Sequence, residues 1–573
     1  MTAFLTDVRG AAAKIGRRQP WSVLGPLLVV QWLALAVFAA AATHNGWLYY
    51  QGGDQSYYWT DAHLLSRWTL PVALVGYAWS YLLIPIAFFA GSNVLSGLPV
   101  VIVLNALILL PVALLCIYGI ATRIAGRVFG YWAAALWIVI PYATIPMFDQ
   151  RYHEKYVDIT LPQSLGLTVL GDFPSTVFLL VTAWLLVRAL DTHDWTDAVL
   201  AGLIGGFTIG LKPSNALFFG AAVLCLLVAT RWVQTAAFLA ALVPGLFLLA
   251  LWKQRGLGEL PAFASMGGSG GSMAAIGAVA PVGSLFSPIH RYVDLDWHHL
   301  HQNIDGVREF FWAVRPLEFV PLAGLLAIGR RSWPKAVLVF GWFITFLLIK
   351  GTDSKANIED ASFFRLLMPS FPAFLLLLAS IPLLVPAFSW SRRVLPDPVP
   401  ALPTRRAGHR VLAVAAVVLV VLPLIFVAGT TPQSTAEAVS YPFQDVYVPV
   451  RDFGLRATHD DGRQILTWNR PYDGKTKVFY TILRSRPVAP DPSSNGDRKA
   501  INGLACRDRQ HGAPLNCLLY MDHLSSVPQE RYIDRAPPGR WTYRVGMTAN
   551  WKNDLSLGDI MIVSKPVTVT VPG

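Results

Sequence analysis

The sequence predicts an α-helical polytopic membrane protein with a soluble β domain at its C-terminal end, on three observations. Of the 573 residues, 54% are hydrophobic and only 14% are charged, whereas a soluble domain carries about 25% charged residues. Apolar runs long enough to cross a bilayer follow one another along residues 1–429. Residues 430–573 are polar instead, and their short runs alternate polar and apolar side chains.

Each predicted span is a run of about 20 mainly apolar residues, which crosses the hydrocarbon core as a helix. About eleven such runs occur, and the short ones leave one pair open. The first is too long for a signal peptide and has no small-residue cleavage site after it, so we expect it to remain as an anchor. The runs lie near 21–43, 97–121, 129–147, 173–190, 196–211, 214–230, 233–252, 316–329, 335–350, 365–387 and 411–429.

Basic residues at the ends of these runs predict the orientation. All fall on one side if the number of spans is right, and cytoplasmic loops are the ones that gather Lys and Arg. The N-terminus is then cytoplasmic and residues 430–573 lie outside the cytoplasmic membrane. The same rule explains the net charge of +12 without a nucleic-acid partner. The basic residues at the ends of the runs are Arg9, Lys14, Arg17, Arg18, Arg123, Arg127, Arg330, Arg331, Lys335, Arg392, Arg393, Arg405, Arg406 and Arg410.

The apolar segment 70–92 would break this alternation if it crossed the membrane. We therefore expect it to be re-entrant or to lie along the interface. Its aromatic residues Trp68, Tyr77, Trp79 and Tyr81 suit the level of the lipid headgroups.

The C-terminal region, 430–573, is predicted to be an extracytoplasmic β-sandwich. The runs "RQILTW", "KVFYTILRS", "RWTYRVGM" and "KPVTVTV" alternate as half-buried antiparallel strands do. "LTWNRPYDGKTKVFYTILRS", with Trp468 and Tyr480 on successive strands, resembles the opening strands of a fibronectin type III or related immunoglobulin-like domain. That resemblance implies a core over about 460–573.

The four cysteines divide between the two regions. Cys116 and Cys225 lie in apolar spans, where we expect packing residues, while Cys506 and Cys517 lie in the polar tail. In an oxidising compartment the second pair is expected to form a disulfide, and a metal pair is the alternative.

The stretch "GGDQSYYWTDAHLL" follows the first span and concentrates candidate site residues. Asp54 and Asp61 are seven positions apart, so on a helix both lie on one face, with Tyr58 between them. One interpretation is a solvated interfacial helix with an aromatic belt. The other is a site in which Asp54 acts on a substrate that Tyr57, Tyr58, Asp61 and His63 contact.

Two more polar positions stand at the outer ends of spans. Asp172, in "GDFPST", either caps the helix that begins there or belongs to a site. Lys212, in "GLKPSN", either extends its side chain to the interface from a helix end or binds an anion.

The order of these segments carries a family resemblance over residues 1–390. The acidic and aromatic outer loop is followed by "GDFPSTVFLLVTAWLLVRAL", "GLIGGFTIGLKPSNALFF" and "ASFFRLLMPSFPAFLLLLASIPLL". This succession resembles the GT-C superfamily of membrane glycosyltransferases, particularly the branch that holds lipid A aminoarabinose transferases and protein O-mannosyltransferases.

The resemblance implies roles for individual residues. Asp54 matches the family's general base in the first outer loop, and Asp172 matches the second acid. Lys212 and Arg365 match the basic residues that bind the donor phosphate. Family members often have two adjacent acids in the first loop, whereas Gln55 follows Asp54 here, which leaves the use of a metal open.

The implied activity is inverting transfer of a single sugar from a polyprenyl-phosphate donor. The acceptor would be a glycan, lipid or protein of the cell envelope, at the outer face of the cytoplasmic membrane. Two alternatives remain. A transporter or flippase of lipid-linked sugars would show polar interruptions near mid-membrane, often in repeated halves. A glycan ligase or polymerase would use a lipid-linked oligosaccharide as donor.

The long loop 253–315 holds two further candidates. Its segment "MGGSGGSMAAIGAVAPVGS" is either a lid over the donor or a plain connection. Asp294, Asp296 and His298 are weak candidates for a divalent cation site, and the alternative is a surface or acceptor-contacting helix.

Overall fold

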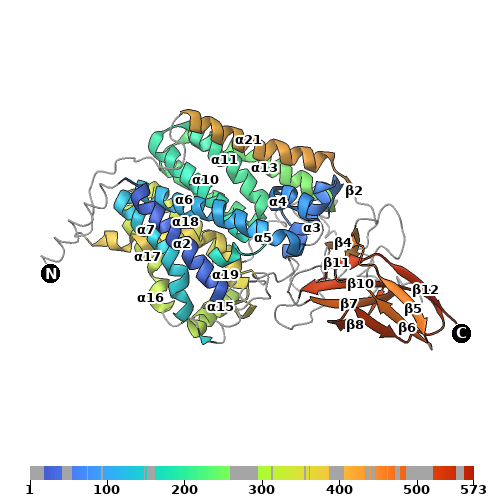
Figure 1. Ribbon diagram of the computed structural model, residues 1–573. Helices are drawn as coiled ribbons and strands as arrows, with labels where there is room; N and C mark the ends of the chain where they lie inside the picture. The colour runs from blue at the N-terminus through green and yellow to red at the C-terminus, as the bar shows by residue number, and fades with distance from the viewer. Residues whose placement is uncertain are drawn as a thin grey trace.

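The structure is a bundle of helices followed by a β region at the C-terminal end (Figure 1). Among the described residues, seven helices are long and apolar enough to cross a membrane, and five shorter apolar helices accompany them. The predicted fold class is therefore confirmed. The computed structural model describes residues 19–41, 54–71, 73, 75–91, 94–147, 149–150, 162–257, 295–311, 314–353, 356–360, 362–385, 406–432, 438–441, 446–460, 462–471, 478–485, 521–549 and 560–572.

Every predicted span coincides with a helix or with a run of consecutive helices. Short 3₁₀ turns and one π-helix, Asn105–Leu109, interrupt the runs, several of them beside prolines that remove a backbone donor. The helices are α2 (Trp21–Ala41), α3 (Asp54–Ser66), α4 (Tyr77–Ala90), α5 (Val94–Leu104), α6 (Leu110–Ala125), α7 (Arg127–Thr144), α9 (Pro162–Leu165), α10 (Asp172–Thr192), α11 (Trp195–Leu211), α12 (Ala216–Val228), α13 (Trp232–Leu257), α15 (Trp297–Phe310), α16 (Val314–Glu318), α17 (Val320–Gly329), α18 (Trp333–Lys350), α19 (Ser362–Leu367), α20 (Phe371–Ser380) and α21 (Arg406–Gly429).

Helix α4 corrects one part of the expectation for segment 70–92, the placement of Tyr77 and Trp79 at the level of the lipid headgroups. Tyr77 and Trp79 are fully buried against neighbouring helices, and the Trp79 indole donates a hydrogen bond to the carbonyl of Val169 at 2.7 Å. They are core residues because the indole N–H finds its partner inside the protein. Trp68 alone of this group is largely exposed.

Helices α11 and α13 pack with their backbones in contact. A Cβ atom on Gly245 would lie 2.4 Å from the Cα of Gly206, and one on Gly202 would lie 2.5 Å from the carbonyl oxygen of Phe238. Small residues permit such an approach between membrane helices. The glycines of "GLIGGFTIG" therefore bring α13 against α11, whose last residue, Leu211, precedes Lys212.

The C-terminal region forms two sheets that pack on each other. The larger has the order β3-β4-β11-β10-β7-β8, with β12 also paired to β10, and the smaller has the order β5-β6-β9. Trp468, beside β6, packs edge-on against Tyr480 of β7 with ring centroids 5.2 Å apart. The strands are β3 (Ala438–Tyr441), β4 (Val446–Arg451), β5 (Arg456–Asp460), β6 (Arg463–Thr467), β7 (Val478–Ser485), β8 (Met521–Val527), β9 (Arg531–Asp534), β10 (Gly539–Ala549), β11 (Ile560–Ser564) and β12 (Val567–Val571).

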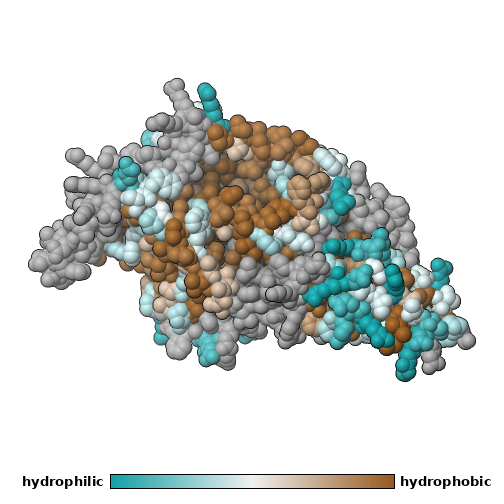
Figure 2. Space-filling view, in the orientation of Figure 1, coloured by the Kyte–Doolittle hydropathy of each residue, from teal (hydrophilic) through white to brown (hydrophobic). Residues whose placement is uncertain are grey.

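The surface separates the two regions by polarity. Figure 2 shows hydrophobic residues over the helices and mainly hydrophilic residues over the β region. The fibronectin type III likeness stays a prediction. Cys506 and Cys517 lie outside the described residues.

A short parallel pair of strands joins the β region to the helices. β1 (Thr69–Leu70) follows α3 and β2 (Thr431–Pro432) follows α21, with Thr69 paired to Thr431. Arg255, near the end of α13, donates hydrogen bonds to the carbonyls of Val427 and Thr430. These contacts thus fix the C-terminal end of α21 beside the end of α3.

Candidate active site

Four charged residues from four separate segments meet at one end of the helix bundle. Asp54 is the first residue of α3 and Asp172 is the first residue of α10. Lys212 directly follows α11, and Arg365 lies in α19. We call these residues the ionic quartet. All four are candidates from the sequence, and in the structure their side chains lie together.

Asp172 is the buried centre of the quartet, with its side chain only 2% exposed. Its Oδ1 accepts a hydrogen bond from Lys212 Nζ at 2.5 Å, and its Oδ2 accepts one from Arg365 Nε at 3.3 Å. Its carboxylate makes no capping bond to the backbone of α10, whose N-cap is Gly171. Asp172 is therefore the partner of an ion pair with Lys212 and not a helix cap.

Asp54 occupies the more open side of the quartet. Its Oδ2 accepts a hydrogen bond from Arg365 Nη2, and its side chain is 39% exposed. Arg365 thus bridges both acids with different nitrogens of one guanidinium. A planar guanidinium suits this task because its donors point in fixed directions. Two acids and two cations leave the quartet with no net charge.

Tyr58 lies beside the quartet, one turn along α3 from Asp54. Its buried hydroxyl donates a long hydrogen bond to the carbonyl of Leu211 at 3.5 Å. Gly171 makes room for it, because a Cβ there would lie 2.9 Å from the phenol oxygen. Burial, and then the nearby carboxylates of Asp54 and Asp172, raise the pKa of Tyr58 well above its usual value. The phenol therefore stays protonated and able to donate.

The other candidates on α3 lie away from the quartet or at its margin. Tyr57 is partly buried against the hydrophobic core. Asp61 and His63 are 4% and 6% exposed, and Lys253 of α13 is the cation that acts on Asp61. Lys253 also donates to the carbonyl of Ala73 at 2.5 Å. Roles for Asp61 and His63 in substrate binding stay predictions.

A second charged cluster marks the opposite end of α10. Asp191 pairs with Arg123 at 3.1 Å and with Lys335 at 2.6 Å. Asp172 and Asp191 lie at the two ends of a 21-residue helix, which is about 30 Å long. That length matches the hydrocarbon core of a bilayer. The quartet and the basic cluster therefore lie at opposite membrane boundaries.

The weak metal candidates are only partly described. Asp296 accepts a hydrogen bond from the backbone amide of His299, at the start of α15, at 3.0 Å. The Nε2 atoms of His298 and Gln302 lie 2.9 Å apart. Within the described part of the chain, no three His, Cys, Asp or Glu side chains gather as a metal-binding group. Asp294 and the glycine-rich segment of loop 253–315 lie outside the described residues.

Three polar residues near the quartet were not assigned roles from the sequence. Gln55 and Asn105 hold the loop that precedes Asp172. Asn215 donates to Ser175 Oγ and to the carbonyl of Thr208, both at 2.7 Å, at the turn that carries Lys212. Asn105 could have been found, because a lone amide in the run "VIVLNALILL" is unusual inside a membrane.

Three comparisons with known proteins find a match only among solved structures. No protein-family description matches the chain, and no curated protein matches it. The solved structures to which the chain is similar include those of the oligosaccharyltransferase AglB of the archaeon Archaeoglobus fulgidus.

The structural alignment covers most of this chain, but the sequence identity and the TM-score are low. A crystal structure of that enzyme tethered to an acceptor peptide with the NVT sequon aligns over 72% of this chain and 56% of that chain, with 15% identity and a TM-score of 0.37. The complex with an inhibitory peptide and a dolichol-phosphate gives 14% identity and a TM-score of 0.38. The chain thus spans a little over half the length of the structures it matches.

Proposed function

We propose that this protein is an inverting glycosyltransferase that moves a single sugar from a polyprenyl-phosphate donor to a hydroxyl of a cell-envelope acceptor. The ionic quartet is the observation that carries the proposal. It combines a partly exposed carboxylate, Asp54, with two cations, Lys212 and Arg365, at a membrane boundary. General base and phosphate-binding cations are the two functions that such a transfer needs.

The donor phosphate would bind at Lys212 and Arg365. A phosphate oxygen that accepts from the Arg365 guanidinium competes directly with Asp54, because both use the same planar set of donors. Asp54 then loses its ion-pair partner and becomes free to accept a proton. Asp172 is fully buried and keeps its bond to Lys212.

The reaction would be a single displacement. The acceptor oxygen forms a bond to the anomeric carbon, and the bond from that carbon to the phosphate oxygen breaks. The hydroxyl proton passes to Asp54, and the lipid phosphate leaves with the electron pair. Lys212 and Arg365 stabilise the charge that develops on the leaving phosphate.

Charge balance favours a monophosphate-linked donor. With Asp54 ionised, the quartet carries no net charge. A sugar on polyprenyl monophosphate adds one negative charge to it. A diphosphate-linked oligosaccharide, the donor of a ligase or polymerase, would add two, which costs more in a site of low polarity.

We also propose that the quartet and the C-terminal region lie outside the cytoplasmic membrane, with the N-terminus in the cytoplasm. The basic cluster of Arg123 and Lys335 at the opposite boundary supports this orientation. Alkaline phosphatase fused after Gly573 should be active in cells, and the same reporter fused before Met1 should be inactive. The reverse pattern would contradict the orientation.

The decisive experiment compares the full-length protein with Asp54→Asn in lipid nanodiscs. Each is given a panel of synthetic polyprenyl-phosphate sugars, and the anomeric configuration of the product is read by NMR. We expect inversion, and a rate about a hundredfold or more lower in the variant.

Asp305→Asn is the matched control, because Asp305 is an exposed acid paired on α15 with Arg308. It should transfer at the rate of the unmodified protein. Equal rates for Asp54→Asn would remove Asp54 from the mechanism. If the unmodified protein transfers from no donor but moves lipid-linked sugar across the bilayer, the transporter alternative is favoured.

A further inference from the structure

We propose that Gln55 and Asn105 are positioning residues that set the place of Asp172 relative to Asp54. Both act through the loop 166–171, which connects α9 to α10 and is buried along its whole length. This inference rests on the proposed function. It concerns two residues whose side chains hydrogen-bond to the backbone of this loop.

Gln55 holds the middle of the loop. Its Oε1 accepts a hydrogen bond from the Val169 amide at 3.0 Å, and its side chain is 1% exposed. Gln55 directly follows Asp54, so one turn of α3 presents the candidate base and also holds the loop that leads to the second acid. The position where the resembled family often has an acid thus carries a structural contact here.

Asn105 holds the beginning of the loop. Its Nδ2 donates to the carbonyls of Gly166 and Thr168 at 2.9 and 3.4 Å. Asn105 opens the π-helix Asn105–Leu109, whose wider turn changes the direction of side chains relative to a regular α-helix. Such turns are frequent at functional sites.

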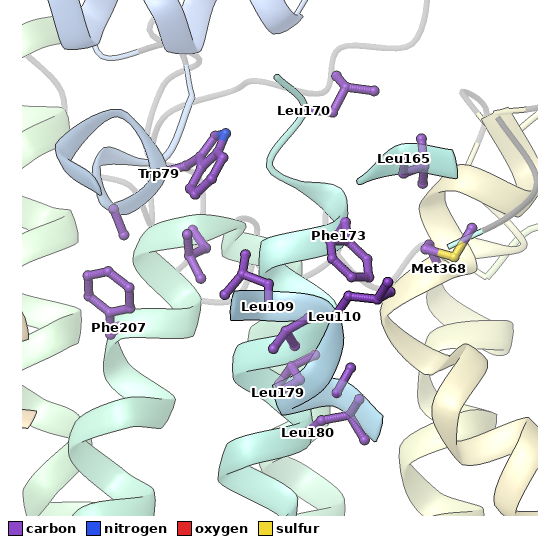
Figure 3. Close-up of a cluster of buried hydrophobic side chains, with 14 of the residues drawn as sticks. Trp79, Leu109, Leu110, Leu165, Leu170, Phe173, Leu179, Leu180, Phe207 and Met368 are labelled. Carbon is purple, nitrogen blue, oxygen red and sulfur yellow. The ribbon is translucent and has the colours of Figure 1, made fainter. Parts of the chain in front are cut away.

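Apolar side chains surround these polar contacts. Figure 3 shows Leu170 on the loop, Leu165 at the end of α9 and Trp79 nearby, with Phe173 at the start of α10 and Leu109 and Leu110 beneath. Hydrogen bonds in such surroundings are strong, and an unpaired amide there is costly. The loop therefore has one favoured position, from which Asp172 reaches both Lys212 and Arg365.

The test uses Gln55→Met and Asn105→Leu in the full-length protein, each with and without Asp172→Asn. Both substitutions keep size and remove the hydrogen bond. In the unmodified background each should lower the transfer rate per folded protein by about tenfold or more, since small displacements of reacting groups cost rate steeply. In the Asp172→Asn background the further loss should be under about twofold, because the effect passes through the missing carboxylate.

Gln234→Met is the matched control, because Gln234 donates to the carbonyl of His193 at the opposite end of α10, at 2.7 Å. It should leave the transfer rate unchanged. Full activity of Gln55→Met and Asn105→Leu, or the same fold loss in both backgrounds, would overturn the inference.

Hydrogen exchange separates this inference from the proposed function. Gln55→Met should speed exchange of the Val169 amide, whether or not any donor is a substrate, and Gln234→Met should not. Unchanged exchange at Val169 would overturn the inference by itself. Absence of transfer by the unmodified protein, together with faster exchange in Gln55→Met, would overturn only the proposed function.

Discussion

His63 is a buried imidazole on the helix that presents Asp54. Burial, and then the positive charge of Arg67, lower the pKa of His63 to about 4 in the folded protein, whereas an unfolded histidine has a pKa of about 6.5. Between these values the unfolded chain binds more protons than the folded one. The free energy of unfolding therefore decreases as the pH falls through this window.

We expect His63→Phe to flatten the pH dependence of stability. The shift for this buried group corresponds to on the order of 3 kcal/mol, present above pH of about 6.5 and lost by about 4. Thermal unfolding midpoints in detergent, measured across this range, should fall more steeply for the unmodified protein than for the variant. Parallel curves would show that His63 does not titrate in this window.

Individual site residues differ in how far the sequence predicts them. Asp54, Asp172, Lys212 and Arg365 stand near the ends of apolar runs, where a charge is conspicuous. Their pairing is not predictable from such positions, since a charged residue there can equally well cap a helix, anchor it at the interface or be solvated. Gln55 is least predictable, because its function depends on a hydrogen bond to a residue 114 positions away.

At the scale of elements, the contact between α11 and α13 supports the position of Lys212. The glycines at 206 and 245 let the two backbones touch. Lys253, further along α13, donates to the carbonyls of Ala73 and Val75, just before α4. The helix that packs against α11 is therefore itself tied to the segment before α4.

Gly245→Ala should destabilise the protein by about 1–3 kcal/mol, because the new methyl group would overlap the Gly206 backbone. Gly220→Ala is the control, since a Cβ there meets nothing within 4 Å. Thermal unfolding in detergent checks both. A midpoint for Gly245→Ala equal to that of the control would contradict the tight contact.

The helices can be predicted from hydropathy, but their packing cannot. Every expected span is a helix or a run of consecutive helices, because a long apolar segment in a bilayer forms a helix. The burial of Tyr77 and Trp79 in α4 was not predictable, since aromatic residues near a membrane boundary suit the headgroup region equally well. Only the neighbouring helices decide between the two places.

At the scale of the whole molecule, the proposed transfer relies on the cations Lys212 and Arg365 where other enzymes use a metal. We expect chelation with EDTA to leave sugar transfer within about twofold of its starting rate, because these two side chains would stabilise a leaving phosphate. The measurement is the rate before and after chelation, with Mg²⁺ and Mn²⁺ restored separately. Loss of transfer that either ion restores would contradict this.

The whole architecture was predictable to the level of helices in a membrane followed by a β region. Composition alone separates residues 1–429 from the tail. The strand order was not predictable, because β4 pairs with β11 across more than a hundred residues. Alternation identifies strands and leaves their partners open.

The spacing of the quartet along the chain determines when the site can exist during synthesis. Asp172 and Lys212 are 40 residues apart and can pair once neighbouring helices α10 and α11 are inserted. Arg365 is 311 residues beyond Asp54, which at about 5–20 residues per second takes the ribosome some tens of seconds. Until then Asp54 lacks its partner, so a nascent chain or one truncated before Arg365 holds no complete site, and closure of the quartet reports that the helices up to α19 have been inserted.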